Sequence, residues 1–120
     1  MCKLVSFEGG KRVADIKLPH IRNIVGQANA AKNINRIMLF GSATEERCTD
    51  CSDIDIAVFG NLPKSTYLNS KEFKAFQDAI FRFDFDQDYD ILYFSDKQPQ
   101  NAPILNDVFM GTEIYRRSAL

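Results

Sequence analysis

The sequence predicts one layered domain of the α+β or α/β class. Short apolar runs, typical of buried strands, alternate along the chain with segments whose apolar residues recur at helical spacing. Turn signals separate most of these segments, and a length of 120 residues fits one domain of common size. Strands and helices in alternation should therefore pack as layers around a single core.

The N-terminal segment 1–17 precedes the predicted core, which covers residues 19–115. Residues 2–7 and 12–16 favour β structure and flank a Gly-Gly pair, a combination typical of a β-hairpin. The alternative is a loose arm. If the hairpin forms, its strands offer an unpaired edge through which a homodimer could assemble.

Helix signals mark three segments. Pro19 suits an initial helical position, and Asn33 tolerates the left-handed conformation of a helix stop. A capping signal at 69–72 opens a second helix whose apolar stripe, ending at Phe83, is predicted to face the core. Gly111 is the expected end of a third. The predicted helices cover about 19–32, 70–83 and 104–109.

The predicted strands are short apolar runs beside turn residues. The first ends in Gly41-Ser42, and the second begins at Asp53 after a polar loop. Continuous apolar runs of this length usually form strands buried on both faces. The strands are expected at 37–40, 53–59 and 89–94, with a brief extended piece at 113–115.

The composition is that of an ordinary globular protein, 45% hydrophobic and 26% charged. A formal charge of −1 argues against a strong electrostatic attraction to nucleic acid or anionic membrane. No apolar run approaches the roughly 20 residues that span a bilayer. Because the N-terminus has no signal-peptide pattern and three cysteines suggest no disulfide framework, we expect a reduced, cytoplasmic setting.

Two carboxylates at the start of the second strand suggest a metal site. Alternate side chains of a strand share one face, so Asp53 and Asp55 should point the same way and repel each other. A hard divalent cation is the natural compensation, and Mg²⁺ completes its shell with phosphate oxygens. Gly41 would let an anion approach the backbone at a sharp turn, and the Ser42 hydroxyl would donate to a phosphate.

A third carboxylate is expected from the third strand. If that strand lies beside the second, Asp90 can join the pair, and two metals about 3.5–4 Å apart would clamp the attacking and leaving oxygens. Asp90 would act through the metal or as a general base, and Asp88 is the alternative. Although Asp84, Asp86 and Asp88 resemble the start of an EF-hand loop, its Gly and distal Glu are absent, so a solvated turn is predicted.

The C-x2-C pair of Cys48 and Cys51 is an alternative metal site. A structural zinc needs further ligands, for which Cys2 and His20 are the candidates. Their spacing resembles no standard zinc site. We therefore predict free cysteines in a loop and an exposed His20 in the first turn of a helix.

The segments Leu39-Phe40-Gly41-Ser42 and 52–58, ten residues after Ser42, resemble the G-S-x10-D-x-D signature of DNA polymerase beta-like nucleotidyltransferases. The size is similar to the minimal nucleotidyltransferases (MNT), and the resemblance covers residues 19–115. It implies a mixed, twisted sheet with helices packed on one side. It also implies that ATP or another NTP donates a nucleoside monophosphate to a hydroxyl, with Mg²⁺ as cofactor.

The resemblance assigns a role to each candidate residue. It implies that Gly41 and Ser42 contact the triphosphate, and that Asp53, Asp55 and Asp90 hold the metals. Many relatives carry an Arg shortly after the Ser, whereas here acidic residues follow it and the first arginine is Arg47. Arg47 is therefore the candidate for neutralising the triphosphate.

The resemblance also implies partners. Minimal members often pair with a helical HEPN protein, an RNase toxin, and act as its antitoxin by transferring AMP to a tyrosine. RNA is the other expected acceptor. A binding module that regulates such a partner without catalysis is the alternative function, because the loop after Ser42 is altered. An antibiotic-modifying enzyme is less consistent with the sequence, since such enzymes use an added domain to hold the drug.

Overall fold

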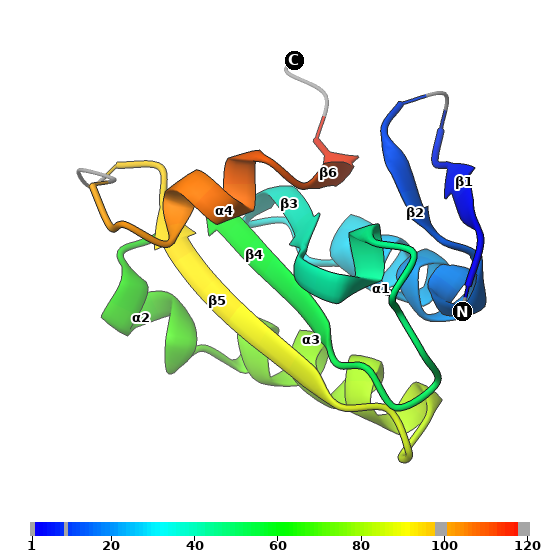
Figure 1. The fold of residues 1–120 in the computed structure, drawn as a ribbon. Helices are drawn as coiled ribbons and strands as arrows, with labels where there is room; N and C mark the ends of the chain where they lie inside the picture. The colour runs from blue at the N-terminus through cyan, green and yellow to red at the C-terminus, as the bar shows by residue number, and fades with distance from the viewer. Residues whose placement is uncertain (1, 9, 98–100, 118–120) are drawn as a thin grey trace.

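The computed structural model, which describes residues 2–8, 10–97 and 101–117, has the predicted α+β fold (Figure 1). Its main sheet has four strands in the order β5-β4-β3-β6. The β3 strand is antiparallel to β4 and β6, whereas β4 and β5 run parallel. The sheet is therefore mixed, as the resemblance implies. The strands are β3 (Ile34–Phe40), β4 (Ile54–Gly60), β5 (Tyr89–Ser95) and β6 (Thr112–Arg116).

The N-terminal segment forms the predicted hairpin rather than a loose arm. Strands β1 (Leu4–Ser6) and β2 (Arg12–Ala14) pair antiparallel in a separate two-stranded sheet. The Thr112 hydroxyl donates a 3.0 Å hydrogen bond to the carbonyl oxygen of Arg12, which attaches the hairpin to the beginning of β6. Gly9 of the predicted turn lies outside the described residues.

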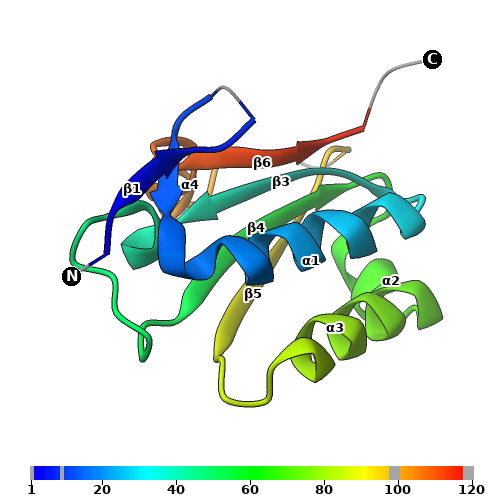
Figure 2. The same ribbon diagram turned by 90° about the vertical axis from the view of Figure 1, so that its right-hand side faces the viewer.

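The two long helices, α1 (Leu18–Ala30) and α3 (Lys71–Phe83), cover one face of the main sheet (Figure 2). The short helix α2 (Lys64–Leu68), which the sequence did not predict, precedes α3 on the same side. Ser70 caps α3, because its side chain accepts a 3.1 Å hydrogen bond from the Phe73 amide. None of the helices in the described part of the chain is long and apolar enough to cross a membrane.

Two local predictions about helix ends were wrong. Asn33 is not a left-handed stop: α1 ends at Ala30 with Ala31 as its cap, and only Glu8 among the described non-glycine residues has a positive φ. The predicted apolar stripe of α3 also ends early, because Phe83 is 49% exposed. Its ring instead lies edge-on to His20.

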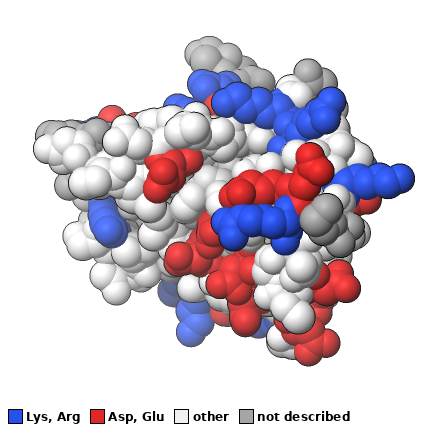
Figure 3. Space-filling view, viewed as in Figure 1, with Lys and Arg blue, Asp and Glu red and all other residues white. Residues whose placement is uncertain are grey.

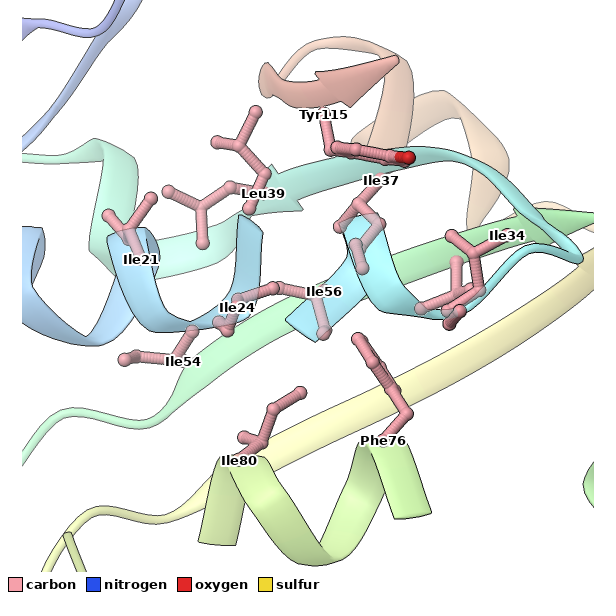
Figure 4. Packing of buried hydrophobic residues seen from close by; sticks show 14 of the residues in the cluster. Ile21, Ile24, Ile34, Ile37, Leu39, Ile54, Ile56, Phe76, Ile80 and Tyr115 are labelled. Carbon is pink, nitrogen blue, oxygen red and sulfur yellow. The ribbon is translucent and has the colours of Figure 1, made fainter. Parts of the chain in front are cut away.

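The main core lies between the sheet and the two long helices (Figure 4). Strand alternation directs every second side chain of β4 into it, beginning with Ile54, while α1 and α3 supply the opposite side. Its central side chains are inaccessible to solvent or nearly so, which gives the burial that stabilises the fold. They include Ile21, Ile24, Ile37, Leu39, Ile54, Ile56, Phe76 and Ile80.

A smaller cluster on the opposite face modifies the expected layering. The short helix α4 (Leu105–Phe109) packs there, so the helices are not all on one side of the sheet. Its buried members are Met38, Phe40, Ala57, Phe59, Leu105 and Val108. This cluster covers the later part of β4, whereas Asp53 and Asp90, at the beginnings of β4 and β5, are exposed.

Candidate functional site

The start of β4 presents two carboxylates on the face away from the long helices. Asp53 immediately precedes β4, and Asp55 is the second residue of the strand. The alternate residues Ile54 and Ile56 are fully buried in the main core. Because side chains of a strand alternate between faces, Asp55 takes the opposite face. Asp53, one residue before the strand, lies close enough for its charge to act on Asp55.

The third candidate, Asp90, lies directly beside Asp55. Strands β4 and β5 are parallel neighbours, and their register pairs Asp55 with Asp90. Residues paired in this way on adjacent strands share a face of the sheet and stand about one strand spacing apart, roughly 4.8 Å. Asp88, the alternative, lies before β5, and its carbonyl oxygen accepts a 3.0 Å hydrogen bond from the Ile54 amide.

The electrostatic surroundings of Asp55 include both other carboxylates. Partial burial raises the pKa of Asp55 above its ordinary value, and the neighbouring charges of Asp90 and Asp53 raise it further. Acidic side chains gather over the beginnings of β4 and β5 on this face of the molecule (Figure 3). A bound cation would relieve this repulsion.

The donor set fits Mg²⁺ combined with a phosphate ligand. Carboxylate oxygens are the ligands this hard cation prefers, and it commonly uses only one or two of them with water and phosphate oxygens. Within the described residues, no three His, Cys, Asp or Glu side chains enclose a metal by themselves.

The residues of the alternative zinc site do not form a common shell. Cys48 is buried in a small cluster with Cys2, whereas Cys51 is exposed, and all three are free thiols. His20 was predicted to be exposed, which is wrong: its side chain is 15% exposed and its Nε2 lies 2.8 Å from Oδ2 of Asp84. The Asp84 side chain is still 39% exposed, and its hydrogen bond to His20 lowers its pKa. Asp86 and Asp88 are exposed, as expected of a solvated turn.

Only glycine fits at the Gly-Ser bend, because the side chain of Asp55 approaches the backbone of Gly41 closely. Gly41 has φ of 74°, which strains any residue with a Cβ, and the preceding Phe40 pairs with Asp55 across the strands. A Cβ on Gly41 would overlap Oδ2 of Asp55. The bend and the carboxylate therefore touch. Ser42 follows in the 3₁₀ turn η2 (Gly41–Thr44).

A cleft opens beside these residues. Its volume is about 480 Å³, within the usual range for small-molecule sites. The end of α4 supplies one wall, including Asp107 and the 80% exposed Met110, two residues that no sequence signal singled out. The cleft is lined by Phe40, Gly41, Thr44, Glu45, Arg47, Asp55, Asp107, Met110 and Gly111.

Arg47 reaches the cleft but shares its charge with an acidic neighbour. Its Nε donates a 2.8 Å hydrogen bond to Oε2 of Glu45, and this bond lowers the pKa of Glu45. Both side chains are exposed, so the pair is weak and screened by salt. Arg47 can therefore exchange this partner for an anionic ligand.

Most of the chain matches the sequence model of one known family. The sequence model of the family described as "Polymerase beta, Nucleotidyltransferase" matches residues 22–119. The chain belongs to this family. The matched range contains the bend, the three carboxylates and α4, while the hairpin precedes it. A search of curated proteins finds no match to the chain.

Proposed function

We propose that this polymerase beta-family protein is a Mg²⁺-dependent nucleotidyltransferase that moves AMP from ATP to a hydroxyl of a protein or RNA acceptor. Membership of the family supports the reaction class. The observation that carries the proposal is the in-register pairing of Asp55 with Asp90 beside the Gly41 bend. Residues 1–120 would act as one cytoplasmic domain.

In this proposal Asp53, Asp55 and Asp90 hold two Mg²⁺ ions. Bound Mg²⁺ neutralises the phosphate charge and lowers the pKa of the attacking hydroxyl. Gly41 and Ser42 hold the triphosphate: the glycine admits phosphate close to the backbone, and the Ser42 hydroxyl donates to an oxygen. Arg47, released from Glu45, contacts the outer phosphates.

The proposed reaction is an in-line displacement. The acceptor oxygen forms a bond to the α-phosphorus as the bond from that phosphorus to the α–β bridging oxygen breaks. Pyrophosphate leaves with that oxygen, and a carboxylate oxygen of Asp90 takes the proton of the hydroxyl. The chain's own contribution is mainly to position reactants and to place charge.

The proposed partner is a HEPN-type protein, for which this chain would serve as antitoxin by modifying it. The similarity to minimal nucleotidyltransferases supports this assignment. A second candidate is a binding module that regulates such a partner without catalysis. One observation favours it: Arg47 is paired with Glu45, and Glu46 adds a further negative charge beside the expected phosphate site.

Label transfer separates the two candidates. The protein is incubated with Mg²⁺, lysate from its source and ATP labelled at the α-phosphate, and labelled protein and RNA are resolved. An enzyme labels an acceptor, and Asp53→Asn abolishes the label. A binding module binds a partner but transfers nothing. If the wild-type protein binds no nucleotide at millimolar ATP with Mg²⁺, the enzyme proposal fails.

A further inference from the structure

Two polar side chains are buried beside the segments that lead to Asp53 and Asp90. Lys17 is 2% exposed and Gln87 is 6% exposed, which makes them rare among the described charged and polar residues. Lys17 ends the turn η1 (Asp15–Lys17), and Gln87 lies between α3 and β5. The Lys17 ammonium donates to Oε1 of Gln87 at 2.6 Å and to the carbonyl oxygen of Asp50 at 3.3 Å.

The Gln87 amide joins the two segments that lead into the site. Its Nε2 donates to the carbonyl oxygens of Ser52 at 3.0 Å and of Asp88 at 2.7 Å. An ammonium group can only donate, so Lys17 requires the oxygen of the Gln87 amide to face it. The NH₂ group must then face the two carbonyls. Lys17 therefore fixes the orientation of the amide.

This network matters most for one of the three carboxylates. Asp55 and Asp90 are held by the register of β4 and β5, whereas Asp53 precedes the strand. The backbone on both sides of Asp53 is tied to the turn before β5: Gln87 holds the Ser52 carbonyl, and the Ile54 amide donates to Asp88. The hydrogen bonds between Ser52 and Thr49 lie within its own loop.

A buried polar group without a hydrogen-bond partner destabilises the folded protein. Every polar group of the Lys17–Gln87 network therefore needs a partner. Gln87 uses its oxygen and its NH₂ group, and Lys17 has two acceptors. Loss of either side chain would leave carbonyl oxygens of the loop without their donor. The loop would then be free to move Asp53 relative to Asp55.

We propose that Lys17 and Gln87 are positioning residues that hold Asp53 in place for metal and nucleotide binding. Lys17 orients the amide of Gln87, and Gln87 fixes the backbone before Asp53 against the strand that carries Asp90. This inference rests on the proposed function. Removing groups that orient metal ligands typically weakens metal affinity or activity by roughly 10- to 100-fold, which sets the expected size.

The decisive variant is Gln87→Glu. Glutamate keeps the size of the side chain and an acceptor for Lys17, but it loses both N–H donors. Calorimetry with ATP and Mg²⁺ compares the wild-type protein, Gln87→Glu, Asp53→Asn and the double variant. We expect Gln87→Glu to weaken binding by roughly 10- to 100-fold and to add little in the Asp53→Asn background, since it acts through Asp53.

Metal-free readouts distinguish positioning from folding. Hydrogen exchange of the Ile54 amide should be faster in Gln87→Glu, while amides in the middle of β4 remain protected. Lys17→Met should weaken binding in the same direction, and its combination with Gln87→Glu should be less than additive. Gln77→Glu, the same chemical change on α3, is the matched control and should leave nucleotide affinity unchanged.

Each failure has its own signature. If the wild-type protein binds ATP with Mg²⁺ and Gln87→Glu binds equally well, the positioning role is overturned while the proposed function stands. An equal loss in the wild-type and Asp53→Asn backgrounds overturns it as well, because the effect would then bypass Asp53. If the wild-type protein itself does not bind, the proposed function fails and the inference fails with it.

Discussion

At the beginning of β4 the two faces of the strand have opposite environments. On one face Ile54 and Ile56 are completely buried against the long helices. On the other, Asp53 is exposed and Asp55 is partly buried among like charges. The same alternation of one strand produces both environments, so the register that builds the core also assembles the site.

This contrast has an energetic consequence. Each buried aliphatic side chain on the core face stabilises the fold by about 1.5–3 kcal/mol. On the open face, the repulsion between clustered carboxylates opposes folding, and a bound cation would relieve it. Burial on the core face therefore offsets the repulsion between the carboxylates on the open face. Functional sites commonly contain such locally unfavourable features that are stabilised elsewhere.

The largest expected effect comes from neutralising the open face. Asp55→Asn should lower nucleotide transfer about a thousandfold, because metal binding supplies several kcal/mol of charge stabilisation. The same variant should raise the melting temperature of the metal-free protein, since it removes repulsion from Asp90 and Asp53. Asp86→Asn, in the exposed turn before β5, is the control. A lower melting temperature for Asp55→Asn would contradict the clustering.

A substitution on the core face should lower stability strongly and change nucleotide affinity little. Ile56→Ala leaves a cavity at a fully buried position and should reduce the free energy of unfolding by about 2–5 kcal/mol, measured by urea denaturation. The folded fraction should still bind ATP with Mg²⁺ at nearly the wild-type affinity. A strong loss of affinity in protein that remains folded would mean that the two faces are not separable.

Gly41→Ala tests the contact between the bend and the open face. The new Cβ would overlap Asp55 in a backbone conformation with positive φ, which costs about 1–2 kcal/mol, and nucleotide affinity should fall. Gly26→Ala in α1 is the matched control, because its Cβ meets no atom within 4 Å. It should stabilise the protein by about 0.5–1 kcal/mol. Equal behaviour of the two variants would rule out the close approach.

A smaller effect is expected on how the stability of the metal-free protein depends on pH. Because the pKa of Asp55 is raised above 3.8 in the folded protein, the folded state holds this proton more tightly than the unfolded state. Its contribution to stability is complete below pH 3.8 and is lost as pH rises through the raised pKa. The free energy of unfolding of the metal-free wild-type protein should therefore fall with rising pH relative to that of Asp55→Asn. The same pH dependence in both proteins would contradict this prediction.

The smallest expected effect is on nucleotide affinity and comes from the ion pair between Glu45 and Arg47 beside the cleft. Glu45→Gln removes the ion-pair partner of Arg47 and frees the guanidinium for phosphate. Exposed pairs are worth about 0–1 kcal/mol, so affinity for ATP with Mg²⁺ should rise by no more than about fivefold in calorimetry at low salt. A decrease in affinity would show that Arg47 does not serve the phosphates.

Local patterns predicted much of the fold because they depend on neighbouring residues. The hairpin and the three central strands follow from residue type, continuous apolar runs and turn signals, and the capping signal located α3 at Ser70. The pairing of Asp55 with Asp90 required a condition that no local pattern supplies, namely that β4 and β5 are adjacent and in register.

Long-range contacts explain what the sequence did not reveal. Lys17 meets Gln87 across 70 positions of the chain, and neither residue differs locally from a surface residue. His20 is covered by Asp84, 64 positions away, which is why its predicted exposure was wrong. The α4 wall of the cleft depends in the same way on how the end of the chain returns to β3.

Paramagnetic broadening tests most directly whether Gly41, Asp55 and Asp90 meet at one metal and phosphate site. Mn²⁺ with ATP is added to isotope-labelled protein, and the loss of backbone amide signals is mapped by NMR. Broadening should be strongest at Gly41, Asp55 and Asp90 and should vanish in Asp55→Asn. Broadening centred on the acidic turn at 84–88, or equal broadening in the variant, would contradict a shared metal and phosphate site.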